Sequence, residues 1–311
     1  MRTLAALLLA FVLTLTARAE EPWLKPNDLV ALVGGEDMVA LAEEGWLETF
    51  VTWDPGKRIR FRSLAWEGDT VFEQRRDLNY PTLETQLDKM GATAVICQFG
   101  KMESFAGKEG VAAFTEAYEK LIARLSGEKK RRIAFVLPAR FSAPPKGSPA
   151  SMPDLTPRNA DFAAYIAAIK AIARKHSSPT LGDESWMDGV EAVSYKTRDG
   201  IHVATEDQLA HGANLLLGSD PVVDLGLVTA SKPEMAFLNQ LRAAIGAKNR
   251  LWFHYTRPQN WAFLAGNRTN QPSSRDHRDP TKRWFPEEME QWLPLIEAKE
   301  QEIWKLAAAP R

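Results

Sequence analysis

Cysteine is nearly absent from this chain: Cys97 is the only one among 311 residues. A single thiol excludes an internal disulfide. Cys97 lies within the apolar run "TAVICQFG", and apolar surroundings keep a thiol protonated and unreactive. We therefore expect a buried cysteine without a catalytic role.

An excess of charge of one sign is also missing, because 39 lysines and arginines face 40 aspartates and glutamates. This balance provides no strong field for a nucleic acid or an anionic membrane. The densest basic run, Lys129 to Arg132, directly precedes the apolar segment "IAFVLP" and is typical of a solvated loop before a strand. We predict no nucleic-acid partner.

Long hydrophobic runs are missing beyond the N-terminus. The apolar stretch at residues 4–15 is too short to span a membrane comfortably. It follows Arg2 and precedes Ala17 and Ala19, which is the order of a secretory signal with an Ala-x-Ala cleavage site. We predict that residues 1–19 are a signal peptide, that no integral membrane span remains after cleavage, and that the protein is secreted or periplasmic. The alternative is an uncleaved N-terminal anchor.

Familiar cofactor and metal motifs are missing as well. The sequence contains neither a glycine-rich phosphate loop nor an HExxH motif. We predict no cofactor and no bound metal.

Instead, the sequence shows apolar runs that alternate with amphipathic stretches. Strands are predicted at 28–34, 58–65, 92–100 and 131–138, and helices at 38–52, 81–91, 110–127, 159–176 and 286–306. Such an alternation predicts an α/β fold whose parallel sheet is covered by helices on both faces. Ligands of these sheets bind beyond the carboxyl ends of the strands.

The segments that follow the strands carry a series of short motifs. The series comprises "GGEDM" at 34–38, "GWLETF" at 45–50, "GDT" at 68–70, "FGKMES" at 99–104, "DGIH" at 199–202 and "FPEEMEQWLPLIEAKEQEIW" at 285–304. In this order and spacing the series resembles the conserved blocks of the SGNH (GDSL-like) hydrolase superfamily, in particular its secreted planctomycete-type members.

The resemblance extends over about residues 28–304 and implies a three-layer, flavodoxin-like α/β fold with a parallel central sheet. It also implies hydrolysis of a carboxylic ester, such as an acyl or acetyl group on a carbohydrate. We expect an SGNH/GDSL hydrolase-like domain at 20–248 and a C-terminal loop-plus-helix extension at 249–311 that packs on it.

An SGNH hydrolase needs a serine nucleophile, oxyanion donors from a glycine and an asparagine, and a histidine with an aspartate three residues before it. Asp199 and His202 match the last pair, and the resemblance implies that Asp199 orients the ring and His202 acts as base. The alternative is a surface turn that contains a histidine.

The other positions depart from this pattern. Alignment on Gly34 puts Glu36 at the serine position. At the oxyanion positions, Ala65 replaces glycine, which keeps the backbone N–H, and Met102 replaces asparagine. A thioether donates no hydrogen bond, and the loss of one oxyanion donor costs about 10²–10³ in rate.

Between the carboxylates of Asp199 and Glu36, His202 is expected as an imidazolium, which cannot act as a general base. Ser63 and Ser104 are the alternative hydroxyls if this alignment is shifted. Glu36, Asp199 and His202 could instead form a carboxylate–imidazole metal site, with His254 or His277 as a further ligand. The spacing of these residues is not typical of a metal site.

Two functions follow. The chain is either an SGNH-type ester hydrolase whose activity is lost or altered, or a non-catalytic extracellular protein that binds a glycan or small ligand in the former active-site pocket. The arginine- and aromatic-rich segment at 250–286 adds four candidate ligand-binding residues, His254, Arg257, Asn260 and Arg268. Packing of this segment across the domain is the alternative.

Overall fold

The computed structural model describes residues 22–74, 76, 79–182, 195–216 and 231–309; the predicted signal peptide lies outside these ranges. Five parallel strands form one sheet in the order β2-β1-β3-β4-β5. Their bounds are β1 (Leu29–Gly34), β2 (Arg60–Ser63), β3 (Ala94–Gln98), β4 (Arg132–Val136) and β5 (Thr180–Leu181). This is the flavodoxin-like strand order, so the predicted parallel α/β sheet is confirmed.

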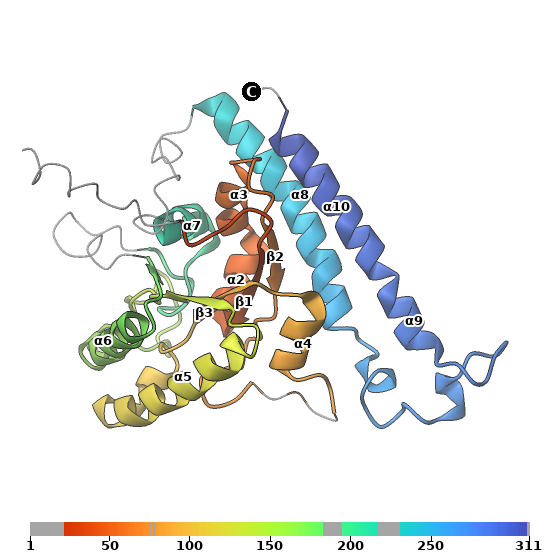
Figure 1. Ribbon diagram of the computed structural model, residues 1–311. Helices are drawn as coiled ribbons and strands as arrows, with labels where there is room; N and C mark the ends of the chain where they lie inside the picture. The colour runs from red at the N-terminus through yellow and green to blue at the C-terminus, as the bar shows by residue number, and fades with distance from the viewer. Residues whose placement is uncertain (1–21, 75, 77–78, 183–194, 217–230, 310–311) are drawn as a thin grey trace, which may run out of the picture.

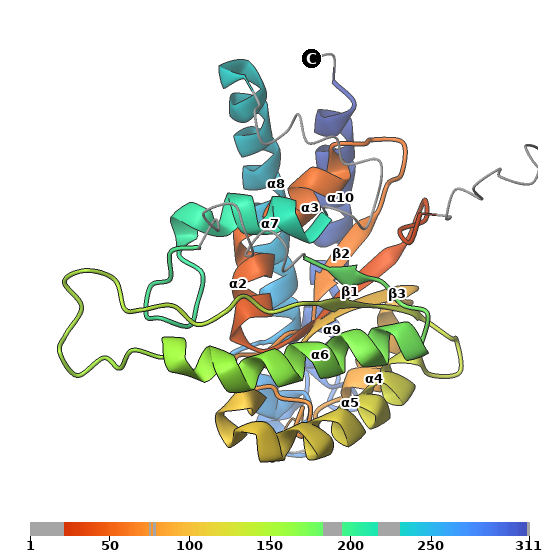
Figure 2. The same ribbon diagram turned by 90° about the vertical axis from the view of Figure 1, so that its left-hand side faces the viewer.

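Helices cover both faces of the sheet, which Figure 2 shows between them. One face carries α4 (Leu83–Met90), α5 (Val111–Ser126) and α6 (Asn159–Lys175), and the other carries α2 (Glu36–Glu44), α3 (Trp46–Thr52) and α7 (Gln208–Leu216). In β1, Ala31 and Val33 join the first core while Val30 and Leu32 join the second, because successive side chains of a strand point to opposite faces. The predicted three layers are therefore confirmed.

The helix predicted at 38–52 is two helices. Gly45 ends α2 with a φ of 72° and begins α3, since glycine adopts this left-handed conformation without strain. The C-terminal helix predicted at 286–306 is likewise two, α9 (Trp284–Glu290) and α10 (Trp292–Ala307), with Gln291 between them.

The longest helix described, α8 (Lys232–Thr256), was not predicted. It begins with a capping box of Ser231 and Glu234 and runs alongside α10 (Figure 1). The expected boundary between residues 248 and 249 lies inside α8, so both sides of it belong to one helix. No helix in the described ranges combines the length and apolarity needed to cross a membrane.

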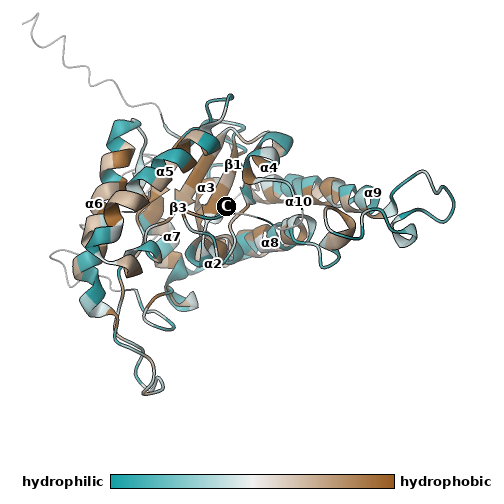
Figure 3. Ribbon diagram, turned by 90° about the horizontal axis from the view of Figure 1, so that it is seen from below, coloured by the Kyte–Doolittle hydropathy of each residue, from teal (hydrophilic) through white to brown (hydrophobic). Residues whose placement is uncertain are grey.

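Four buried charged side chains fasten α8 and α10 to the edge of the sheet. Lys248 of α8 donates to Glu48 of α3 and lies 3.6 Å from Glu300 of α10. Glu300 also pairs with Arg62 of β2. Figure 3 shows the hydrophobic strands at the centre and the C-terminal helices extending to one side, where this cluster provides the attachment.

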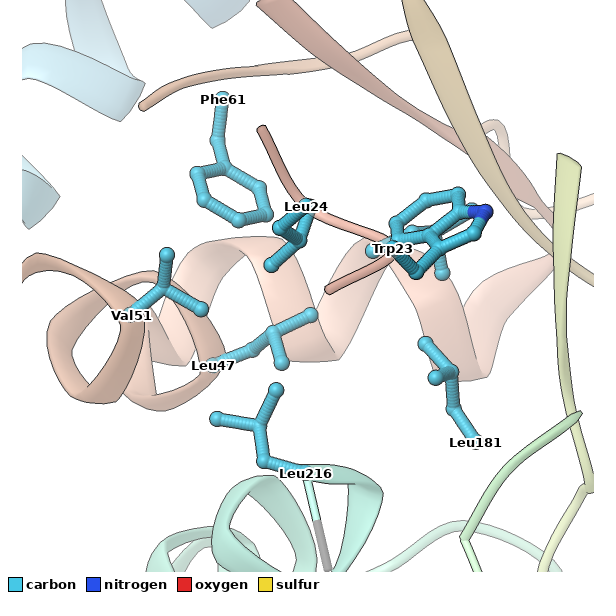
Figure 4. A pocket seen from close by; sticks show the side chains of 8 residues that line it. Trp23, Leu24, Leu47, Val51, Phe61, Leu181 and Leu216 are labelled. Carbon is cyan, nitrogen blue, oxygen red and sulfur yellow. The ribbon is translucent and has the colours of Figure 1, made fainter. Parts of the chain in front are cut away.

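One void within the core is very small. Between α3, α7 and the sheet, apolar side chains such as Leu47, Phe61 and Leu216 surround a void of about 10 Å³ (Figure 4). Such a space is at the limit for one water and offers no polar partner. On the opposite face Cys97 is fully buried, and burial raises its pKa to about 12. The expected buried thiol is confirmed.

Candidate functional site

The turn that carries His202 holds the imidazole against Asp199. Oδ1 of Asp199 accepts the backbone N–H groups of Ile201 at 3.0 Å and His202 at 2.8 Å, and Oδ2 lies 2.6 Å from His202 Nδ1. Gly200 has a φ of 85°, which lets the chain turn between the two residues. Asp199 therefore fixes both the backbone and the ring.

Neighbouring elements hold this turn at the carboxyl edge of the sheet. Lys101, just after β3, donates to the carbonyl of Ile201 at 2.5 Å. The backbone N–H of Ser142 donates to the carbonyl of Gly200 at 3.0 Å, and the Gly200 N–H donates to Thr197 Oγ1 at 2.8 Å. These contacts place the imidazole beside the strand ends, where α/β sheets bind ligands.

Glu36 meets the other nitrogen of the ring. It is the first residue of α2, and only Gly35 separates it from β1, which ends at Gly34. Its Oε2 lies 3.2 Å from His202 Nε2, and Arg198 forms an ion pair with its other oxygen. A Cβ on Gly34 would lie 2.7 Å from the carbonyl of Gln98, so glycine allows this close entry into the helix. The N-terminus of α2 favours the carboxylate electrostatically.

His202 thus lies between two carboxylates, as the sequence alignment requires. Both ring nitrogens face carboxylate oxygens, at 3.2 Å for Nε2 and 2.6 Å for Nδ1. Burial acts to raise the pKa of Asp199, but the N–H groups and ring that donate to it lower that pKa below its ordinary value. Two carboxylates and the Arg198 guanidinium thus surround the imidazole.

The serines considered as alternatives have other partners. Ser104 is buried and donates to the carbonyl of Lys101 at 2.6 Å, and Ser63 Oγ accepts the N–H of Ala65 at 3.4 Å. In the described part of the chain, no serine or threonine hydroxyl forms a hydrogen bond with His202.

Ala65 and Met102, the two oxyanion positions, have partners other than the His202 ring. Ala65 is buried, and its carbonyl accepts from Arg257. Met102 has an exposed fraction of 51% and precedes a short 3₁₀ helix. The N–H of Gly100 donates at 2.7 Å to Glu103, a carboxylate whose pKa burial raises. Within the described ranges, no hydrogen bond or ion pair links Ala65 or Met102 to His202.

A second buried group lies behind Glu36. Lys101 pairs with Asp37 at 3.1 Å, and both interact electrostatically with His211 of α7. Burial lowers the pKa of His211 to about 4. Sequence reasoning missed Arg198, Lys101 and His211, although Arg198 directly precedes the "DGIH" motif and Lys101 lies inside "FGKMES".

The four C-terminal candidate residues have different surroundings. Arg257 pairs with Glu67, donates to the Ala65 carbonyl and stacks 4.4 Å from the Trp66 ring centroid, so it fastens the end of α8 to the loop after β2. His254 and Asn260 line one open pocket of about 650 Å³. Arg268 stacks on Phe263 at 5.6 Å.

No group of three or more histidine, cysteine, aspartate or glutamate side chains in the described ranges is arranged to hold a metal ion. Glu36, Asp199 and His202 pair with one another and with Arg198 instead.

Of the comparisons with known proteins, only the one with solved structures found matches. No family model and no curated protein matches the sequence. Among solved structures, the gut microbial diltiazem-metabolizing enzyme BT4096 has a TM-score of 0.59 at 10% identity, over 91% of this chain and 96% of that one.

Two further structures match over a smaller share of this chain. A putative GDSL-like lipase from Parabacteroides merdae has a TM-score of 0.46 at 11% identity, over 63% of this chain and 97% of that one. The acetyl xylan esterase AlAXEase has a TM-score of 0.45 at 15% identity, over 60% and 96%. At such identities a structural likeness concerns the fold alone.

Proposed function

We propose that this chain, which has the fold of the SGNH/GDSL-like hydrolases, has lost serine ester hydrolysis and binds a polar ligand at the surface around Glu36 and His202. The observation that carries the proposal is the contact between Glu36 Oε2 and His202 Nε2. This nitrogen is the one that would take the proton of a serine nucleophile. A carboxylate occupies its position instead.

A carboxylate in this position does not perform the same chemistry. Its attack on an ester would give an anhydride rather than an acyl-serine, and it has no proton for His202 to remove. Moreover, Glu36 already pairs with Arg198, and Met102 offers no donor to an oxyanion. The nucleophile and an oxyanion donor are replaced, and the retained histidine faces a carboxylate, which together favours loss of the reaction.

The same groups suit a binding site. The exposed fractions of the side chains are 37% for Glu36, 31% for Asp199 and 56% for Arg198, so each presents polar atoms to solvent. Carboxylate acceptors beside a guanidinium donor match the hydroxyl groups of a carbohydrate or a small polar molecule. We propose such a ligand, met outside the cytoplasm because the N-terminus has the pattern of a secretory signal.

The reaction is tested with p-nitrophenyl acetate. We expect no His202-dependent turnover by the native protein, because no serine hydroxyl in the described ranges forms a hydrogen bond with the ring. Glu36→Ser should gain slow turnover that His202→Ala removes. Adding Met102→Asn should raise it further, by up to about 10²-fold if the amide reaches the oxyanion. Native turnover that disappears in His202→Ala would overturn the proposal and indicate an unrecognised nucleophile.

The binding half is tested on a glycan array. Native protein should bind a subset of glycans, and Arg198→Ala should lose that subset, because it removes the guanidinium but leaves Asp199 and His202. Arg174→Ala is the matched control, since Arg174 is an exposed arginine on α6. Equal loss in both variants, or no glycan retained by native protein, would contradict a carbohydrate ligand.

A further inference from the structure

A large cavity opens between α4 and the C-terminal helices α8, α9 and α10, elements that Figure 1 shows on one side of the molecule. Its volume is about 950 Å³, and its lining reaches the sheet at β1 and β2. Pockets that hold small organic molecules measure about 300–1,000 Å³. Neither Glu36 nor His202 lines this cavity, so an inference about it does not depend on the function proposed above.

Much of the cavity wall is apolar. Leu64 and Trp252 belong to the core on the α4 face of the sheet, and Met90 and Leu293 pack against that core. Trp252 is fixed by a hydrogen bond from its indole N–H to the carbonyl of Ser63 at 2.7 Å. The core therefore holds this wall in place in the absence of a ligand.

The cavity also contains a cation without a counter-charge. Arg60 and Arg62 stand two residues apart in β2, so they point to the same face of the sheet. Arg62 pairs with Glu300 and lies 5.3 Å from the Trp252 ring centroid. The half-buried Arg60 side chain has no ion pair or hydrogen bond to any described residue. Partial burial makes an unpaired charge costly.

The other charges of the lining leave a positive excess. Arg283 donates to the carbonyls of Phe263 and Leu264, and its Nε is buried without an acceptor. Of the lining carboxylates, Glu290 pairs with Lys89 at 2.6 Å. Glu297 accepts an amide from Gln301. Among the described residues that line the cavity, two arginines, Arg60 and Arg283, thus lack a carboxylate partner, and one carboxylate, Glu297, lacks a cation.

We propose that this cavity binds an amphipathic carboxylate of the fatty-acid type. The carboxylate would pair with the guanidinium of Arg60, which can receive both oxygens. The hydrocarbon chain would lie along Leu64, Met90 and Trp252, where its burial removes apolar surface from water. One molecule would thereby meet both the unpaired cation and the apolar wall.

The test uses the full chain with octanoate as probe and octan-1-ol as its uncharged match, by isothermal titration calorimetry. Octanoate should bind about tenfold more tightly than octan-1-ol, since the charged hydrogen bonds to Arg60 are absent from the alcohol. Arg60→Gln should abolish this difference and leave octan-1-ol binding unchanged. Met90→Trp, which fills the cavity, should weaken both probes. Arg174→Gln on α6 is the matched control and should behave like native protein.

Native protein provides a second readout, in which a variant is used only to assign one signal. Octanoate should shift the NMR signal of the Trp252 indole N–H, identified by its loss in Trp252→Phe. The proposal is overturned if this signal does not move, if octanoate binds no better than octan-1-ol, or if a folded Arg60→Gln protein keeps the native preference for the carboxylate.

Discussion

Replacement of Lys248 by methionine is expected to destabilise the protein by about 3–5 kcal/mol, the usual cost of leaving a buried charge without its partner. Lys248 has an exposed fraction of 0% and Glu48 one of 4%. Burial raises the pKa of Glu48, and the ammonium of Lys248 opposes this effect. Without Lys248, the Glu48 carboxylate would face the interior alone or take up a proton. Urea unfolding of both proteins at pH 7 measures the difference.

A second substitution separates the charge from the packing. Lys248→Met with Glu48→Gln should recover part of the lost free energy of unfolding, because the uncompensated carboxylate is gone. Lys299→Met on α10 is the control: Lys299 pairs with Glu302 at an exposed site, where such pairs contribute about 0–1 kcal/mol. If Lys248→Met changes stability no more than Lys299→Met, the cluster does not fasten α8 to the domain.

The buried cluster also shows why the sequence predicted the sheet better than the C-terminal region. Strands buried on both faces appear as continuous apolar runs, such as "LVALVG" in β1 and "AVICQ" in β3. By contrast, the charged residues of α8 interrupt its apolar periodicity. Lys248 is buried because Glu48 lies beside it in space, 200 positions earlier in the chain. No local pattern contains that pairing.

The same distinction applies to the candidate site. The Asp199–His202 pair is local, so its spacing within the series of motifs predicted it, and its partner Glu36 followed from the alignment of the same motifs. Arg198 and Lys101 act across the fold, on Glu36 and on the carbonyl of Ile201. The sequence around an arginine in a loop does not indicate its partner. Arg257, a candidate ligand-binding residue in the sequence, donates to Glu67 and to the carbonyl of Ala65 in the structure.

The free energy of unfolding should fall as the pH drops from about 7 to 4, in part because of His211. Its ordinary pKa of 6.5 is lowered to about 4 by burial, with a smaller opposing effect of Asp37 and a further lowering by Lys101. Between these two values the unfolded chain binds a proton that the folded protein excludes, so stability decreases with decreasing pH. A shift of this size corresponds to roughly 3 kcal/mol. Below pH 4 both states are protonated and the loss stops.

The contribution of His211 is isolated by comparing native protein with His211→Phe, which keeps an aromatic ring beside Tyr195, whose ring centroid lies 5.2 Å from that of His211. Buried carboxylates titrate in the same range and act in the opposite direction: Glu103, whose pKa is raised by burial, favours the folded state as the pH falls. These contributions cancel in the difference between the two proteins. That difference should change by roughly 3 kcal/mol between pH 7 and 4. Parallel curves would mean that His211 takes up its proton over the same pH range in the folded protein as in the unfolded chain, so that burial beside the Asp37–Lys101 pair does not exclude the imidazolium.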